Sequence, residues 1–126
     1  MIKGKKLLAS LRAAHKGLLL VFDREQNFRI HTICGVFALV FALVLKIPST
    51  DFLILCITIV FVLACEVINT GMEHFLDVIK PRVAPAVRDI KDMMAGLVLL
   101  SAILSLLVGI GIFLPPLTAM VSPLFQ

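Results

Sequence analysis

Three long apolar runs, separated by short polar segments, dominate the pattern of this 126-residue chain. The runs lie at about residues 28–47, 51–79 and 86–114. Each is long enough for an α-helix that crosses a hydrocarbon core of ~30 Å, which takes about 20 residues. The pattern therefore predicts an all-α integral membrane protein, with residues 1–126 forming a single domain.

The first 24 residues follow a different pattern. Apolar side chains such as Leu7, Leu11, Ala14 and Leu18 recur at spacings of three and four, and basic residues lie largely between them. This periodicity is typical of an amphipathic helix that lies in the membrane interface, with its basic face toward anionic headgroups. We therefore expect a surface helix over residues 1–24, and a merely solvated basic terminus is the alternative.

Polar or proline-containing segments mark the expected ends of the helices. They lie at Asp23–Asn27, Lys46–Asp51 and Lys80–Pro85. Proline lacks a backbone donor and its ring clashes with the preceding turn, so it ends or kinks a helix. For that reason the pair Pro115–Pro116 is expected to end the last helix.

The net charge of +4 is carried largely at the ends of the apolar runs, where membrane proteins place interfacial anchors. Lys and Arg gather in the amino-terminal segment and in residues 80–91, whereas the turn after residue 45 and the tail hold one between them. Cytoplasmic loops carry the excess of these residues. The amino terminus and the second connection are therefore expected to be cytoplasmic, and no nucleic-acid partner is expected.

The second apolar run ends in a polar stripe formed by Glu66, Asn69, Glu73 and Asp77. At ~100° per residue, these four side chains fall within roughly 80° of one another on a helix. A carboxylate deep in a membrane span costs about 2.5 to 3.5 kcal/mol on insertion scales. Such residues normally mark ion, proton or substrate chemistry. A stripe that only joins helices by hydrogen bonds is the alternative, although a single Asn would serve that purpose.

The predicted topology brings Glu25, Glu73 and Lys91 to one membrane interface and leaves Glu66 about 10 Å deeper. Carboxylates bind Mg²⁺, which shares its other positions with phosphate and water, and a lysine holds phosphate oxygens as a point charge. Together these residues favour phosphoryl transfer, in which catalysis is mostly positioning and charge neutralisation. Glu66 suits a general base that takes a proton from a lipid hydroxyl.

Two other classes of protein are compatible with part of this pattern. A small oligomeric channel or proton pathway would use the stripe as a pore lining, but it gives no role to Glu25, Lys91 and Asp92. A non-catalytic helper subunit would tolerate amides in place of the acids. His31 and His74 share no ligand spacing, so they are expected to make structural or headgroup contacts rather than bind a metal.

The polar stripe resembles a motif of the small three-span prokaryotic diacylglycerol kinases and undecaprenol kinases. Residues 66–77, Glu-Val-Ile-Asn-Thr-Gly-Met-Glu-His-Phe-Leu-Asp, are similar to that family's E-x-x-N-[ST]-x-x-E-x-x-x-D, and Lys91–Gly96 lies at the family's separation from it. Residues 25–31, Glu-Gln-Asn-Phe-Arg-Ile-His, resemble the E-x-N-F-R-I-H form common in Gram-positive-type members. The resemblance covers about residues 7–114.

The resemblance implies a lipid kinase of the bacterial inner membrane that uses ATP and Mg²⁺ and works as a homotrimer, with active sites composed from neighbouring subunits. The matching positions are Glu66 as the base; Glu25 and Glu73 as metal ligands; Glu25, Glu73, Asp77, Lys91 and Asp92 as nucleotide contacts; and Glu66, Asn69, Ala95 and Lys6 as lipid contacts. The Asn27–His31 form favours undecaprenol as the acceptor over diacylglycerol.

The chain departs from the family pattern at two places. Leu11 and Ala13 stand where many members have aromatic residues, and Val83–Ala84 stands where many have a Tyr-His pair. Contacts to the nucleotide from these positions are therefore expected to differ.

Overall fold

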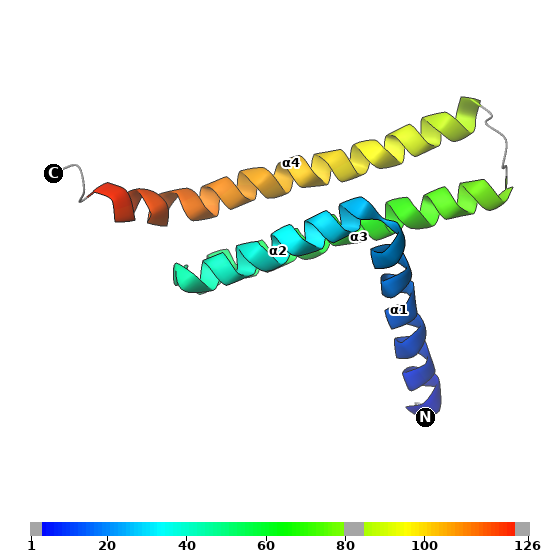
Figure 1. The fold of residues 1–126 in the computed structure, drawn as a ribbon, viewed down its shortest axis with the longest axis horizontal. Helices are drawn as coiled ribbons and strands as arrows, with labels where there is room; N and C mark the ends of the chain where they lie inside the picture. The colour runs from blue at the N-terminus through cyan, green and yellow to red at the C-terminus, as the bar shows by residue number, and fades with distance from the viewer. Residues whose placement is uncertain (1–3, 80–84, 123–126) are drawn as a thin grey trace.

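Three of the helices lie side by side as a membrane bundle, and the first leaves them at a steep angle (Figure 1). The computed structural model describes residues 4–79 and 85–122. Within these ranges the helices are α1 (Gly4–Arg24), α2 (Gln26–Val44), α3 (Ser49–Ile79) and α4 (Pro85–Val121). The last three are long and apolar enough to cross a membrane. The predicted fold class, a surface helix followed by three membrane helices, is confirmed.

Among the described residues, α1 is buried only near its carboxyl end. Val21 is its one buried residue, and every residue from Gly4 to Leu20 is exposed. Leu7, Leu11 and Leu18 are each more than half exposed. An apolar stripe left open beside basic residues is the arrangement expected of a helix that lies on a membrane surface.

The corner between α1 and α2 consists of Glu25 alone, whose backbone is extended at φ −99° and ψ 116°. Arg29, in the first turn of α2, spans this corner with its side chain. Its Nη1 donates to the carbonyl oxygens of Phe22 at 3.0 Å and Asp23 at 2.9 Å. These carbonyls belong to the last turn of α1, where no intrahelical partner is available. The contact therefore sets both the direction of α1 and the position of Glu25.

α2 ends in a Schellman motif, and Lys46 takes the left-handed conformation at φ 52°. The Lys46 N–H donates to the Leu43 carbonyl at 3.2 Å, and the Ile47 N–H donates to the Ala42 carbonyl at 3.2 Å. Ala42 and Ile47 also pack in one hydrophobic cluster. The helix thus ends at Val44, before the predicted boundary at residue 47.

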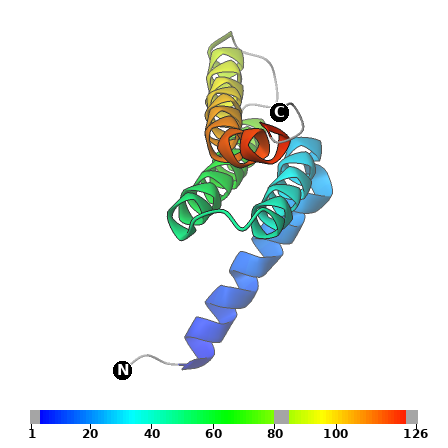
Figure 2. The same cartoon turned by 90° about the vertical axis from the view of Figure 1, so that its left-hand side faces the viewer.

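α3 is the central element, because it packs against both α2 and α4 (Figure 2). Leu55 of α3 joins Ala42 of α2 and Ile112 of α4 in the core. At the closest approach of α2 to α3, a Cβ atom at Gly35 would lie 2.8 Å from Cγ2 of Ile59. Glycine is therefore required where these two helices meet.

The prediction that Pro115–Pro116 ends the last helix is wrong, because α4 continues through both prolines to Val121. The missing donors leave two carbonyls of the preceding turn unpaired and the rings push the axis aside, so the helix bends near its end (Figures 1 and 2). Thr118 donates its hydroxyl to the Pro115 carbonyl at 2.9 Å.

Candidate active site

Glu66 on α3 is the one ionisable side chain that is fully buried within residues 4–79 and 85–122, at 1% exposed. Its carboxylate oxygen Oε1 is buried and accepts no hydrogen bond from the residues described. Thr70, one turn along, donates its hydroxyl to the backbone carbonyl of Glu66 at 3.0 Å, so it does not donate to the side-chain carboxylate. A buried acceptor without a donor is costly and rare in native proteins, which makes this carboxylate a candidate functional group.

Asn69 and Glu73 continue the polar stripe toward one end of α3. The Asn69 amide nitrogen donates to Glu73 Oε1 at 3.3 Å. Asn69 Oδ1 is buried and accepts no hydrogen bond from the described part of the chain. The amide therefore orients the Glu73 carboxylate and keeps an acceptor of its own free for a hydroxyl or a partner side chain.

Glu25 approaches the same end of the bundle from the α1–α2 corner. Arg24, beside Glu25, places Nη1 2.7 Å from Nε2 of His74, beside Glu73. Because an arginine only donates, this histidine nitrogen is the acceptor. The contact between their chain neighbours thus brings Glu25 and Glu73, from two different segments, to the same end of the bundle.

Asp77 and Lys91 connect α3 to α4 beyond these acids. The Lys91 Nζ lies 2.6 Å from Asp77 Oδ1, and the side chains are 35% and 62% exposed. Lys91 is therefore held at the polar end of the bundle, within reach of solvent. This is the depth at which the sequence placed the nucleotide contacts.

Three predicted site residues do not meet these acids within one chain. Asp92 and Ala95 are exposed on α4. Lys6 is exposed in the first turns of α1, and the amino-terminal end of that helix lies away from the bundle (Figure 1). Val83–Ala84, where the chain departs from the family pattern, lies outside the described residues.

The acids present at this site fit a magnesium ion. No three His, Cys, Asp or Glu side chains of the described residues come together as a complete metal site. Mg²⁺ does not require one, since it is commonly bound by one or two carboxylates together with substrate phosphates and water. The pair Glu25 and Glu73 matches that donor set.

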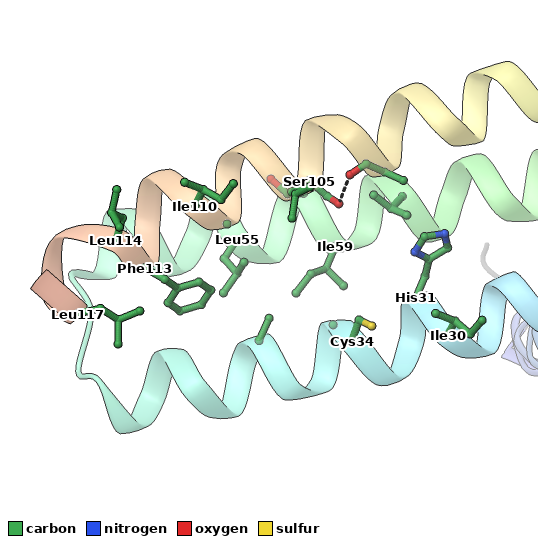
Figure 3. A pocket seen from close by; sticks show the side chains of 17 residues that line it. Ile30, His31, Cys34, Leu55, Ile59, Ser105, Ile110, Phe113, Leu114 and Leu117 are labelled. Carbon is green, nitrogen blue, oxygen red and sulfur yellow. Dashed lines mark hydrogen bonds between the residues drawn. The ribbon is translucent and has the colours of Figure 1, made fainter.

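An apolar cavity of about 620 Å³ lies between α2, α3 and α4 (Figure 3). Its walls carry Cys34, Ile59, Ser105 and Phe113, and His31 lies at one end with its ring pointing from α2 toward α3. His31 is also the residue that faces Glu66, at 3.6 Å. Sequence reasoning left His31 out of the site, although its place at the end of the Glu25–His31 segment was the available signal.

The chain is similar to proteins of one known family. Residues 12–113 match the family model described as prokaryotic diacylglycerol kinase. A diacylglycerol kinase from Synechocystis sp. (strain ATCC 27184 / PCC 6803 / Kazusa) is 36% identical over 115 residues, which are 90% of this chain and 66% of that protein. An undecaprenol kinase from Bacillus subtilis (strain 168) is 29% identical over 104 residues, 82% of this chain and 85% of that protein.

The chain thus spans just under two thirds of the length of the Synechocystis relative. The segment matched by the family model contains every predicted site residue except Lys6. The buried acid and the acids and lysine at the bundle end therefore lie within the part of the chain that the family shares. The family prediction is confirmed: the chain belongs to the prokaryotic diacylglycerol kinase family, a family of membrane lipid kinases.

Proposed function

We propose that this protein transfers the γ-phosphate of ATP, with Mg²⁺, to the hydroxyl of a membrane lipid. The observation that carries the proposal is the Glu66 carboxylate, buried at 1% exposed with Oε1 unpaired among the described residues, on the same polar stripe of α3 as Glu73. A carboxylate at that depth meets a hydroxyl presented from the membrane, while the shallower acids meet a nucleotide that comes from water.

Glu66 acts as the general base in this reaction. Its carboxylate accepts the proton of the lipid hydroxyl as the hydroxyl oxygen attacks the γ-phosphorus, and ADP leaves with the electrons of the broken P–O bond. Desolvation strengthens the interaction between the carboxylate and the hydroxyl, since no water competes for it. Asn69 supports the site through its amide nitrogen, which donates to Glu73 Oε1 and orients that carboxylate.

The polar end holds the phosphates. Glu25 and Glu73 would hold Mg²⁺, which supplies neutralisation of the charge on the β- and γ-phosphates when it is bound. Lys91 lies at the same end and has three ammonium donors, of which Asp77 accepts one at 2.6 Å. The remaining donors are directed to phosphate oxygens, with Asp77 and Asp92 completing the nucleotide contacts.

The hydrocarbon part of the lipid lies in the cavity between α2, α3 and α4. The walls are almost wholly apolar, so they suit a hydrocarbon chain and exclude a charged nucleotide. The cavity begins at His31, which faces Glu66 (Figure 3). A chain in this groove presents its hydroxyl at the level of the buried carboxylate.

The working unit in this proposal is a homotrimer in a bacterial inner membrane, with the amino terminus and the α3–α4 connection cytoplasmic. Three predicted contacts, Lys6, Asp92 and Ala95, are exposed and apart from the acids of their own chain. Neighbouring subunits would bring these side chains to the acids and enclose the nucleotide, which no glycine-rich loop of this sequence does.

Undecaprenol is the proposed acceptor, on the basis of the Glu25–His31 segment. Diacylglycerol is the second candidate, because the Synechocystis relative, at 36% identity, is named a diacylglycerol kinase. Both are lipid alcohols, so the reaction and the roles of the acids are the same for either.

The test is phosphate transfer from labelled ATP to each lipid in mixed micelles, comparing the native chain with Glu73→Gln. Loss of a metal-binding carboxylate should lower the turnover by about 10² or more and raise the Mg²⁺ requirement. Asp51→Asn is the matched control, because Asp51 lies in the first turn of the same helix and far from the site. Absence of transfer to either lipid by folded, oligomeric native protein would refute the proposal.

A further inference from the structure

His31 on α2 and Glu66 on α3 face each other inside the bundle. The Nε2 atom of His31 lies 3.6 Å from Oε1 of Glu66, and the two side chains are 25% and 2% exposed. This same Oε1 is the buried carboxylate oxygen without a hydrogen bond from the described residues. The buried oxygen of the proposed base that has no donor therefore lies opposite an imidazole nitrogen.

The separation is a few tenths of an ångström longer than an N–H···O hydrogen bond, which spans 2.7 to about 3.2 Å. Hydrogen bonds of catalytic groups are commonly long before the substrate binds and shorten in the reacting complex. A neutral imidazole has one N–H donor and one acceptor nitrogen. A tautomer that carries its proton on Nε2 supplies the donor that Oε1 lacks.

We propose that His31 is a positioning residue for Glu66, in which Nε2–H donates to Oε1 and turns the second carboxylate oxygen, Oε2, toward the acceptor hydroxyl. This inference rests on the proposed function, because it assigns the geometry of the base in that reaction. His31 does not exchange a proton with the lipid. Its effect is transmitted through the orientation of one carboxylate.

The location of His31 explains why this position matters for a lipid acceptor. His31 lines the end of the apolar cavity as well as facing Glu66 (Figure 3). A hydrocarbon chain in the cavity therefore ends beside the imidazole, and the hydroxyl it carries is at the level of Glu66. His31 therefore orients Glu66 at the end of the cavity where the apolar lining meets the polar stripe of α3.

The kinetic test replaces His31 by Leu, which removes the donor at similar size, and by Gln, whose amide can donate in its place. His31→Leu should lower kcat by about 10²-fold, the cost of a ~1 Å misplacement of a reacting group, with an unchanged KM for ATP. His31→Gln should recover most of that loss. Ile33→Ala is the matched control, because Ile33 lies two residues along α2, is 52% exposed and does not line the cavity, and this variant should match the native chain.

A double-mutant cycle distinguishes action through Glu66 from an independent role. In a Glu66→Gln background, His31→Leu should lower the residual rate less than threefold, because the carboxylate it orients is already gone. An equal loss in both backgrounds would overturn the inference. So would a native-like kcat for His31→Leu, or a failure of His31→Gln to recover activity when that variant binds ATP normally.

Infrared spectroscopy tests the contact without using turnover. The band of Glu66 is identified as the difference between native protein and Glu66→Gln, and it should shift in His31→Leu but not in Ile33→Ala. An unshifted band would overturn the contact. Native protein that transfers phosphate while His31→Leu is unaffected refutes the inference alone, whereas native protein without transfer to any lipid refutes the proposed function itself.

Discussion

Substitution of Gly35 by alanine should separate the two helices that carry the site. Gly35 lies on α2, one turn after His31, against Ile59 of α3. An added Cβ would lie 2.8 Å from Cγ2 of Ile59. Carbon atoms pack favourably at about 3.5 to 4.0 Å, so α2 must retreat by roughly 1 Å or Ile59 must leave its rotamer.

Two opposing free-energy terms set the size of this effect. Overpacking of a close contact costs about 1 to 3 kcal/mol. Replacement of a helix-interior glycine by alanine contributes about 0.8 to 1.0 kcal/mol of stability. Gly111→Ala isolates the second term, because a Cβ at Gly111 meets nothing within 4 Å in the described structure. The free energies of unfolding of the two variants should therefore differ by about 1 to 3 kcal/mol.

The measurement is unfolding in detergent with increasing SDS, together with kcat for lipid phosphorylation. Gly35→Ala should also lower kcat by about tenfold or more, since retreat of α2 carries His31 away from Glu66. Ile59→Ala removes the opposing Cγ2 atom, so Gly35→Ala should cost little in that background.

Equal stability of Gly35→Ala and Gly111→Ala would refute the reasoning, because the contact with Ile59 would then carry no steric cost. A full effect of Gly35→Ala in the Ile59→Ala background would refute it as well, since the clash would lie with another group.

Two further substitutions test the polar end of the bundle. Asp77→Asn should leave the unfolding midpoint unchanged, because exposed ion pairs contribute little stability, yet it should raise the KM for ATP severalfold by releasing Lys91. Asp89→Asn, at the same end of α4 as Lys91, is the control. An unchanged KM for ATP in Asp77→Asn would contradict the role of this ion pair. Arg29→Leu should raise the Mg²⁺ concentration for half-maximal rate severalfold, because the corner that holds Glu25 loses two hydrogen bonds. Arg12→Leu on exposed α1 should have no such effect, and equal effects would show that the corner is not held by Arg29.

The polar stripe illustrates what helical periodicity can predict about a site. The spacing placed Asn69 and Glu73 on one face of α3, and the structure joins them by a hydrogen bond of 3.3 Å. The same reasoning placed Glu66 deeper than Glu73, and it is the fully buried acid. These relations lie within one helix, so rise and turn per residue are enough to derive them.

Pro115–Pro116 is a place where the rule that proline ends a helix fails. Proline removes one helical hydrogen bond and its ring pushes the preceding turn aside, but the residues after it can keep their own hydrogen bonds. In α4, Thr118 donates its hydroxyl to the Pro115 carbonyl at 2.9 Å, and the helix bends and continues to Val121. A pair of prolines is therefore compatible with a bend as well as an end, and the contacts of the following turn decide between them.

The three membrane helices, the basic surface helix, the acid stripe and the family could be predicted from the chain alone, because hydrophobic length, periodicity and motif spacing are properties of contiguous segments. The pairing of His31 with Glu66 and the contact of Arg24 with His74 became known only from the fold. Each joins residues of different helices. Their meeting depends on how closely those helices pack and in which register, and side-chain packing across the interface sets both.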